Sequence, residues 1–303
     1  ETGLPWKGNH PNLPNHKEGS LKRLTNLTRK LQKTELSKTY GEIINEQQNN
    51  GIIEEAPESL VGTEFYIPHK PVVRESAEST KLRIVYDASA RAHPDAPSLN
   101  DCLNAGPALQ NRLWDVLVRM RFHPVALAGD LKQAFLQVRI KEADRDALRF
   151  HWKPDELSEL QTLRFTRALF GLTCSPFLLG GVIEHHLETW KERKLEAVSE
   201  IEKSMYVDDL ISGQPTVSKA KQLKEKAIEI FKDAIFTLHK WHSNEPGLED
   251  ALKPTSEDVT YAKQHFGPVN EGQCSLLGLP WNKSADTISV VIPTKAAKTT
   301  KRG

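Results

Sequence analysis

Several features that would assign a chain to a common class of protein are missing from this sequence of 303 residues. No apolar run is long enough to span a bilayer, and no basic leader precedes an apolar stretch, which argues against a membrane-embedded chain. The three cysteines, Cys102, Cys174 and Cys274, are odd in number and form no CxxC pair. They favour free thiols in a reducing intracellular setting over a disulfide framework.

Loops that bind phosphate groups are also missing. Neither a GxGxxG sequence nor a Walker-type loop occurs, so any phosphate must be held by metal ions or by arginine side chains. A general excess of basic residues is missing too, because 41 Lys and Arg stand against 40 Asp and Glu. Positive charge is concentrated locally, with seven basic residues and two acidic ones at positions 17–38. Such a stripe can follow a phosphate backbone, although a solvated helix face is its commoner origin.

The length allows one large domain or two ordinary ones. The chain begins at Glu1, and its only methionines are Met120 and Met205. We therefore expect an excerpt from a longer polypeptide.

Apolar periodicity predicts an irregular alternation of helices and hairpins. Helices are expected near residues 21–31 and 40–44, and over 107–123, 176–203 and 216–235. Strand-like runs occupy 64–73, 81–89, 125–130, 147–152, 162–169 and 274–281. This order is typical of an α+β fold with an antiparallel sheet. In the second run, strand alternation places Arg83 on the face opposite Leu82, Ile84 and Tyr86.

The stretch SMYVDDLISG at residues 204–213 places two adjacent acids between apolar runs. If MYV and LIS are the arms of a hairpin, Asp208 and Asp209 lie at its tip, where two like charges raise each other's pKa. A divalent cation removes that cost, and Mg²⁺ prefers carboxylate and phosphate oxygens. Asp130, which ends the apolar strand VALAGD, becomes a third carboxylate if the two strands are neighbours. Three carboxylates holding two cations are suited to in-line phosphoryl transfer.

Each of these features has a simpler explanation when it is taken alone. An Asp-Asp pair near a turn is usually solvated turn chemistry. His239 and His242 have HxxH spacing, but no third ligand follows at a convincing interval, so no metal site is expected there. Cys174 lacks an activating histidine and is expected to be a packed thiol. The combination of YVDD, the strand-ending Asp130 and the intervening FGLTCSP is far more specific than its parts.

YVDDLISG resembles the metal-binding hairpin of reverse transcriptases, and the similarity extends in order over residues 1–285. The sequence of these blocks most resembles that of the Bel/Pao class of retrotransposons. The matching blocks are GLPWKGNHPNLPNH, SLKRLTNL, LRIVYDASA, SLNDCLNAGPAL, VALAGDLKQAFLQV, TRALFGLTCSPF, LHKWHSN and LLGLPW. Retroviral and other retrotransposon polymerases share the catalytic blocks but not the sequences that flank them.

The resemblance implies a right-hand polymerase with fingers and palm, an antiparallel palm sheet and a thumb that is largely missing. The implied segments are a lead-in with a basic helix (1–40), fingers (41–105 and 138–168), palm (106–137 and 169–273), and a primer-grip strand with the start of a thumb (274–303).

The resemblance also implies the residues of the site. Asp130, Asp208 and Asp209 are the palm carboxylates, with Asp130 and Asp208 as the principal metal ligands. The backbone of Leu131 lies at the metal site and offers an N–H to the triphosphate. Phe135 takes the place of the bulky steric gate against the 2′-hydroxyl of a ribonucleotide.

Other positions are implied to contact the nucleotide or the primer. Arg83 matches the fingers arginine that contacts the triphosphate, and Arg74 is a second phosphate contact. Phe170 and Gly171 line the pocket for nucleotide and template. The primer-grip residues are Leu277, Gly278, Leu279 and Trp281. Lys240 is the nearest match to the lysine that protonates the leaving pyrophosphate.

The implied cofactors are two Mg²⁺ ions, which Mn²⁺ can replace. The implied partners are an RNA or DNA template with its primer, dNTPs, and the protease, RNase H and integrase domains of a parent polyprotein, with no membrane. The expected location is intracellular, in a cytoplasmic retrotransposon particle.

Two other functions stay open at this point. One is another palm polymerase, such as an RNA-dependent RNA polymerase, against which the bulky Phe135 argues. The other is a decayed or domesticated copy that only binds nucleic acid, against which the intact aspartates and Arg83 argue.

Overall fold

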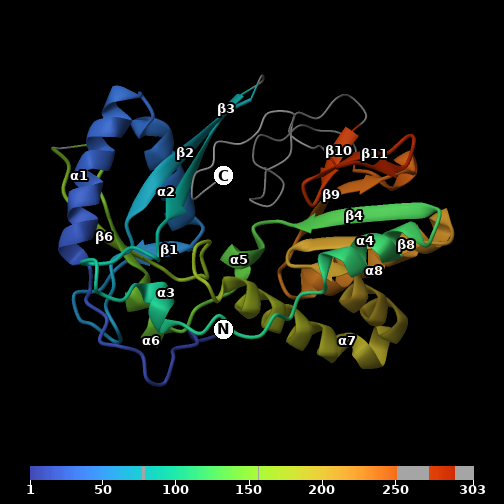
Figure 1. Cartoon of the computed structure of the whole chain (residues 1–303), viewed down its shortest axis with the longest axis horizontal. Helices are drawn as coiled ribbons and strands as arrows, with labels where there is room; N and C mark the ends of the chain where they lie inside the picture. The colour runs from blue at the N-terminus through green and yellow to red at the C-terminus, as the bar shows by residue number, and fades with distance from the viewer. Residues whose placement is uncertain (77–78, 156, 251–272, 291–303) are drawn as a thin grey trace. The chain divides into compact units, whose positions relative to one another are not determined.

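The computed structural model describes the chain except residues 77–78, 156, 251–272 and 291–303. It combines helices with antiparallel sheets, as the sequence predicts (Figure 1). The chain forms two compact units: the first contains Glu1–Leu109 and Ala134–Ile183, and the second contains Gln110–Gln133 and Glu184–Gly303. No helix among the described residues is both long and apolar enough to cross a membrane.

Two helices open the first unit. Helix α1 spans Lys17–Lys33 and buries Leu24, Leu27 and Leu31, while its basic residues lie on the other faces. Helix α2 spans Ser37–Asn49 and buries Tyr40 and Ile44. Both follow the apolar spacing of the sequence.

The remaining elements of the first unit are short. A three-stranded antiparallel sheet has the order β1 (Ile53–Glu55), β6 (Gln161–Phe165), β5 (Arg149–Trp152), and β2 (His69–Ser76) pairs with β3 (Ser79–Tyr86). The helical turns are α3 (Leu99–Cys102), α5 (Ala134–Gln137), α6 (Glu142–Arg145) and η1 (Asp146–Leu148). The β2–β3 hairpin starts later than the predicted run 64–73, because the backbone of Phe65 and Ile67 bonds to Asp146 and Arg149 instead of to β3.

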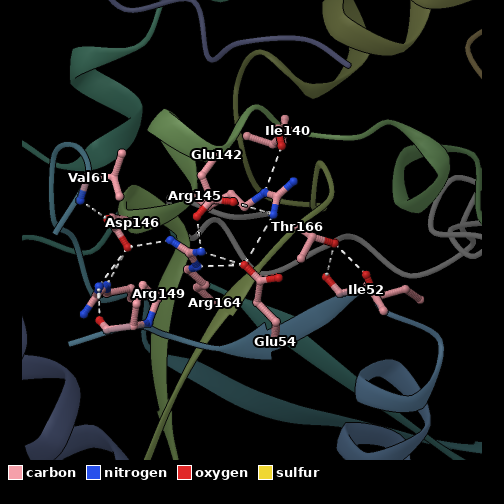
Figure 2. Close-up of polar contacts among 12 residues, drawn as sticks. Ile52, Glu54, Val61, Ile140, Glu142, Arg145, Asp146, Arg149, Arg164 and Thr166 are labelled. Carbon is pink, nitrogen blue, oxygen red and sulfur yellow. Dashed lines mark hydrogen bonds and ion pairs between the residues drawn. The ribbon is translucent and has the colours of Figure 1, made fainter. Parts of the chain in front are cut away.

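A network of ion pairs around the buried Asp146 lies in the first unit (Figure 2). The Asp146 carboxylate is fully buried and accepts from Arg149 at 2.8 Å and from Arg164 at 3.0 Å. Arg164 also contacts Glu54 and Glu142, and Arg145 contacts the same two glutamates. The network joins β1, β5 and β6 to the α6–η1 segment.

The second unit is built on a four-stranded antiparallel sheet. Its order is β7 (Met205–Tyr206), β8 (Asp209–Gln214), β4 (Val125–Leu131), β9 (Leu238–Ser243). All seven residues of β4 are buried, which explains why VALAGDL reads as one apolar run up to its aspartate. The helices are α4 (Leu113–Arg121) and α8 (Val217–Asp233), and α7 (Ser175–Ser204), kinked at Lys194, belongs to both units.

Two predicted elements of the second unit differ from the structure. Helix α4 begins at Leu113 and not at residue 107, because the Asn111 side chain bonds to the backbone of Glu202 and Met205. The single predicted strand 274–281 is a hairpin of β10 (Gln273–Leu276) and β11 (Leu279–Asn282), followed by β12 (Thr287–Ile288) and preceded by η2 (Pro246–Leu248). Leu277 and Gly278 form its turn with φ of 49° and 87°.

The core of the second unit leads directly to one end of its sheet. Val116 and Met120 of α4 pack with Ala126 and Ala128 of β4, together with Ile211, Leu276 and Trp281. Side chains alternate along a strand, so the face that carries Ala126 and Ala128 also carries Asp130. On this face of β4, the apolar core therefore ends at Ala128, and Asp130 is the next side chain.

Candidate active site

Three aspartates gather at this end of the sheet. Strands β4 and β8 pair in a register that places Asp130 opposite Asp209. Asp208 lies in the turn between β7 and β8, and its carbonyl oxygen accepts the backbone N–H of Leu131 at 2.8 Å. One carboxylate oxygen from each aspartate lies within 4.8 Å of the other two. The prediction that Asp130 comes alongside the aspartate pair is confirmed.

The turn that carries Asp208 has an unusual backbone. Tyr206 pairs with Asp209, so Val207 and Asp208 form a two-residue connection. Val207 has φ of 57°, which is costly for a β-branched side chain. Residues held in such conformations concentrate at functional sites, where the surrounding structure stabilises them.

The three side chains are buried, which decides the electrostatics of the site. Asp130, Asp208 and Asp209 are 2%, 7% and 5% exposed. Carboxylates of one sign, brought together away from water, repel one another more strongly than they would at the surface. Because carboxylate oxygens are the ligands that Mg²⁺ and Mn²⁺ prefer, this donor set fits a hard divalent cation.

His239 lies next to the aspartates, a position that was not predicted from the sequence. It lies opposite Asp130 in the β4–β9 pair, and its Nε2 is 3.3 Å from Asp130 Oδ2. The HxxH spacing raised only the question of a separate metal site with His242, and no such site was expected. The available signal was different: a polar residue in the strand-like block LHKWHSN can face an acid across a sheet.

A bulge in β9 sets this contact. The register shifts between Ala128 and Asp130, and Lys240 has φ of 51°. Gly129 lies in the same stretch, and a Cβ added there would come within 2.9 Å of the Trp241 ring. Lys240, the residue proposed to protonate pyrophosphate, thus occupies the bulge beside His239.

The role expected for the Leu131 N–H needs correction. This N–H donates to the Asp208 carbonyl and is therefore used inside the sheet. A backbone contribution of Leu131 to a metal must come from its carbonyl oxygen.

The first unit brings together other predicted residues. Phe135 on α5 is buried, and its ring meets the half-exposed ring of Phe170 edge-on, with centroids 4.6 Å apart. Gly171 has φ of 110°, and a Cβ there would lie 2.6 Å from the Tyr86 carbonyl oxygen. Only glycine fits this position, because a side chain would meet the Tyr86 carbonyl oxygen and the backbone has a positive φ.

The two arginines lie on the β2–β3 hairpin. Arg83 is opposite Val72, and its side chain is partly exposed. Tyr86 packs edge-on against Phe150 and Phe165, so strand alternation directs Arg83 away from that core. Arg74 pairs with Lys81, and its side chain lies outside the described part.

The residues expected to grip the primer form the β10–β11 hairpin. Leu277 and Gly278 are its turn, and Leu279 begins β11. Trp281 is fully buried and donates its indole N–H to Asp286 at 3.1 Å. Its side chain therefore anchors the hairpin on the core. Cys174 is also buried, and burial raises the pKa of its thiol to about 11, as expected for a packed thiol.

Comparison with known proteins identifies a domain. Residues 93–241 match the family model for reverse transcriptase (RNA-dependent DNA polymerase). No curated protein shows a significant match.

Solved structures of viral protease-reverse transcriptases are among those similar to this chain. The foamy viral protease-reverse transcriptase in complex with an RNA/DNA hybrid is 16% identical, with a TM-score of 0.48, over 78% of this chain and 25% of that chain. The native prototype foamy virus protease-reverse transcriptase is 16% identical, with a TM-score of 0.49, over 80% and 26%. The chain spans about a quarter of the length of these two proteins.

The matched segment contains Asp130, Asp208 and Asp209, together with Phe135, Phe170 and Gly171. Its helices and antiparallel sheets form the fold of a polymerase palm and fingers. Residues 93–241 thus match a reverse transcriptase domain, and reverse transcriptases belong to the nucleotidyltransferase class.

Proposed function

We propose that this chain is the RNA-directed DNA polymerase of a Bel/Pao-type retrotransposon. It adds dNTPs to a primer 3′-hydroxyl as directed by an RNA or DNA template. The observation that carries the proposal is the buried group of Asp130, Asp208 and Asp209 inside the segment that matches the reverse transcriptase family.

The three aspartates would hold two Mg²⁺ ions, which Mn²⁺ can replace. Such ions, when bound, increase the acidity of an attacking hydroxyl and stabilise the charge on a leaving phosphate. The protein's part is to fix the ligands: β4 and β8 hold Asp130 and Asp209 in register, and the Leu131 N–H holds the Asp208 backbone. Lys240 would supply a proton to the pyrophosphate.

The nucleotide would be bound by residues of the fingers and palm. Arg83 and Arg74 would contact the triphosphate with guanidinium groups, which suit phosphate oxygens in geometry and charge. Phe135 would exclude the 2′-hydroxyl, and Phe170 and Gly171 would line the pocket. The fingers would comprise 41–105 and 138–168, the palm 106–137 and 169–273, and the segment from 274 the primer grip and the start of a thumb.

The parent protein would be a polyprotein with protease, RNase H and integrase domains, located in an intracellular, cytoplasmic particle. The free thiols support an intracellular location. The resemblance to Bel/Pao sequences supports the polyprotein and the particle.

Primer extension tests the proposal. The chain is given a labelled primer on an RNA template, Mg²⁺, and either dNTPs or rNTPs, with a DNA template in parallel. We expect extension with dNTPs on both templates and at least a hundredfold lower kcat/KM with rNTPs. Preferred use of rNTPs would point to an RNA polymerase, and duplex binding without extension would point to a silent remnant.

The Phe135→Val variant tests the sugar gate. A smaller side chain should raise the kcat/KM for rNTPs by tenfold or more while dNTP use changes little. If Phe135 only packs against Phe170, both substrates should suffer equally, together with a loss of about 1–3 kcal/mol in stability. The measurement is the ratio of kcat/KM for dNTP over rNTP, with the melting temperature as control.

A further inference from the structure

Asn100 occupies a position where one side-chain amide joins three segments of the first unit. Its Nδ2 group donates to the Gly171 carbonyl oxygen at 2.8 Å and to Ser89 Oγ at 2.9 Å. Its Oδ1 accepts the backbone N–H of Thr173 at 3.0 Å. The amide therefore links α3, the turn after β3, and the loop that begins at Phe170.

The chemistry of the partners fixes the orientation of this amide. A backbone carbonyl can only accept, and a backbone N–H can only donate. The NH₂ group must face Gly171 and the oxygen must face Thr173. No other side chain of the same size offers a donor and an acceptor in this arrangement, because aspartate lacks the donor and leucine lacks both.

The loop is held on its other side by shape. Gly171 lies so close to Tyr86 that its missing Cβ leaves room for the Tyr86 carbonyl oxygen. Ser175 Oγ donates to the Leu169 carbonyl oxygen at 2.7 Å, which closes the loop. The two hydrogen bonds from the Asn100 side chain, to Gly171 and Thr173, hold the backbone on both sides of the buried Leu172.

Asn100 is itself held by a short but well-capped element. Ser98 and Asp101 form a reciprocal capping box at the start of α3, and Arg91 contacts Asp101 at 2.9 Å. The Asn100 backbone N–H donates to the Ala88 carbonyl oxygen at 3.2 Å. The amide thus starts from a fixed platform next to the end of β3, the strand that carries Arg83.

We propose that Asn100 is a positioning residue that sets the place of Phe170 and Gly171 for the incoming nucleotide. This inference rests on the proposed polymerase function and adds a residue to it. Phe170 leans edge-on against Phe135, so a displacement of the loop changes the floor and wall of the proposed nucleotide pocket together. Binding geometry loosened by an ångström can cost large factors in rate or affinity.

The test uses Asn100→Asp, which keeps the shape but places a carboxylate oxygen against the Gly171 carbonyl. We expect the KM for dNTP to rise five- to twentyfold, with kcat and primer–template affinity changed less than threefold. Asn104→Asp is the matched control, because Asn104 is exposed and its side chain makes no hydrogen bond within the described part of the chain. It should behave like the parent.

Asn100→Ala repeats the test without a new charge, in case the aspartate variant fails to fold. A purely structural role would lower the melting temperature and reduce nucleotide use and duplex binding in parallel. That result, or an unchanged KM in well-folded variants, would overturn the proposal.

Hydrogen exchange separates this inference from the proposed function. The Thr173 amide should exchange at least tenfold faster in Asn100→Ala than in the parent or in Asn104→Ala. Unchanged exchange would show that Asn100 does not hold the loop. If the Thr173 amide exchanges faster in Asn100→Ala but the parent chain cannot extend primers, Asn100 holds the loop, whereas the polymerase function and the nucleotide role of Asn100 are refuted.

Discussion

The ion-pair network of the first unit and the aspartate group of the second unit are both clusters of charge, but they differ in composition. The network pairs three arginines, Arg145, Arg149 and Arg164, with the buried Asp146, with Glu54 and Glu142 (Figure 2), and with Glu1 and Glu64. The aspartate group brings three carboxylates within 4.8 Å of one another. A carboxylate beside arginines is neutralised within the fold, whereas three neighbouring carboxylates suit a hard divalent cation.

Asp146 illustrates how the arginines stabilise a buried carboxylate in the network. Its burial opposes ionisation and raises its pKa, but hydrogen bonds from the Val61 N–H and from Arg149 and Arg164 outweigh burial and hold the pKa below the ordinary value. The charged form is thus the one that the fold stabilises. Substitutions can separate such a structural cluster from a functional one, because activity and stability should respond in opposite ways.

The largest effect is expected from Asp208→Asn. Removing one of three like charges from a proposed metal site should lower the rate of nucleotide addition about a thousandfold, equivalent to about 4 kcal/mol. The melting temperature should stay the same or rise, because repulsion between the aspartates decreases. Single-nucleotide extension and thermal melting are measured on the same sample. Asp115→Asn, at an exposed position of α4, is the control. Near-normal activity of a folded Asp208→Asn protein would show that Asp208 is not part of the active site.

Asp146→Asn should show the opposite pattern. The substitution leaves buried Arg149 and Arg164 without their shared carboxylate, and breaking a buried pair costs about 3–5 kcal/mol. We expect a large decrease in the free energy of unfolding, measured with urea, and normal activity in the fraction that remains folded. Glu42→Gln breaks the exposed Lys38–Glu42 pair and should change stability by less than about 1 kcal/mol. Equal stabilities for the two variants would contradict a structural role for the network.

Buried histidines of the first unit should add a pH dependence of intermediate size. Burial lowers the pKa of His69 from 6.5 to about 4, although a hydrogen bond to the His151 carbonyl opposes the shift. The folded state therefore disfavours the protonated form, so stability is full above pH 6.5 and is lost as the pH falls toward 4. One such group should cost about 2 kcal/mol at pH 5.

The measurement compares urea unfolding at pH 7.5 and pH 5 in the parent and in His69→Gln. The variant should show a smaller decrease in stability between the two pH values. An identical decrease would assign the acid sensitivity to other groups, of which His151, with a pKa lowered to about 4 mainly by burial, is the first candidate.

The smallest effect is expected at the edge of the aspartate group. His239 lies 3.3 Å from Asp130 Oδ2, and a donated hydrogen bond would hold that carboxylate in place. His239→Leu should raise the Mg²⁺ concentration needed for half-maximal extension severalfold. His239→Gln keeps an N–H donor, so its half-maximal Mg²⁺ concentration should be lower than that of His239→Leu. If both variants match the parent, the contact has no part in holding the ligand.

The sequence predicted the parts of the site that depend on local pattern. The apolar run of β4 ending on Asp130, the YVDD hairpin and the helix predicted over 216–235, which spans Val217–Asp233, follow from strand and helix periodicity. Periodicity also located the β5–β6 hairpin. These features depend on residues that are close together in the sequence.

Features that depend on distant partners could not be predicted. Nothing near Asn100 announces its bonds to Gly171 and Thr173, and nothing near Asp146 identifies Arg164 as a partner. Periodicity alone predicted one strand at 274–281, because apolar residues flank Leu277 and Gly278, whereas the resemblance implied the hairpin that the structure shows there. The side chain of Arg74, together with residues 291–303 of the expected thumb, lies outside the described residues.

The close approach of Gly129 and Trp241 has a consequence for how such sequences can change. The indole ring occupies the volume that a side chain at position 129 would need, so neither position can vary independently of the other. Among related chains that share the bulge, a residue larger than glycine at position 129 should accompany a smaller ring or an aliphatic residue at position 241. An alignment of relatives would reveal the two positions as a covarying pair, and abundant sequences with bulky residues at both would show that their bulge is built differently.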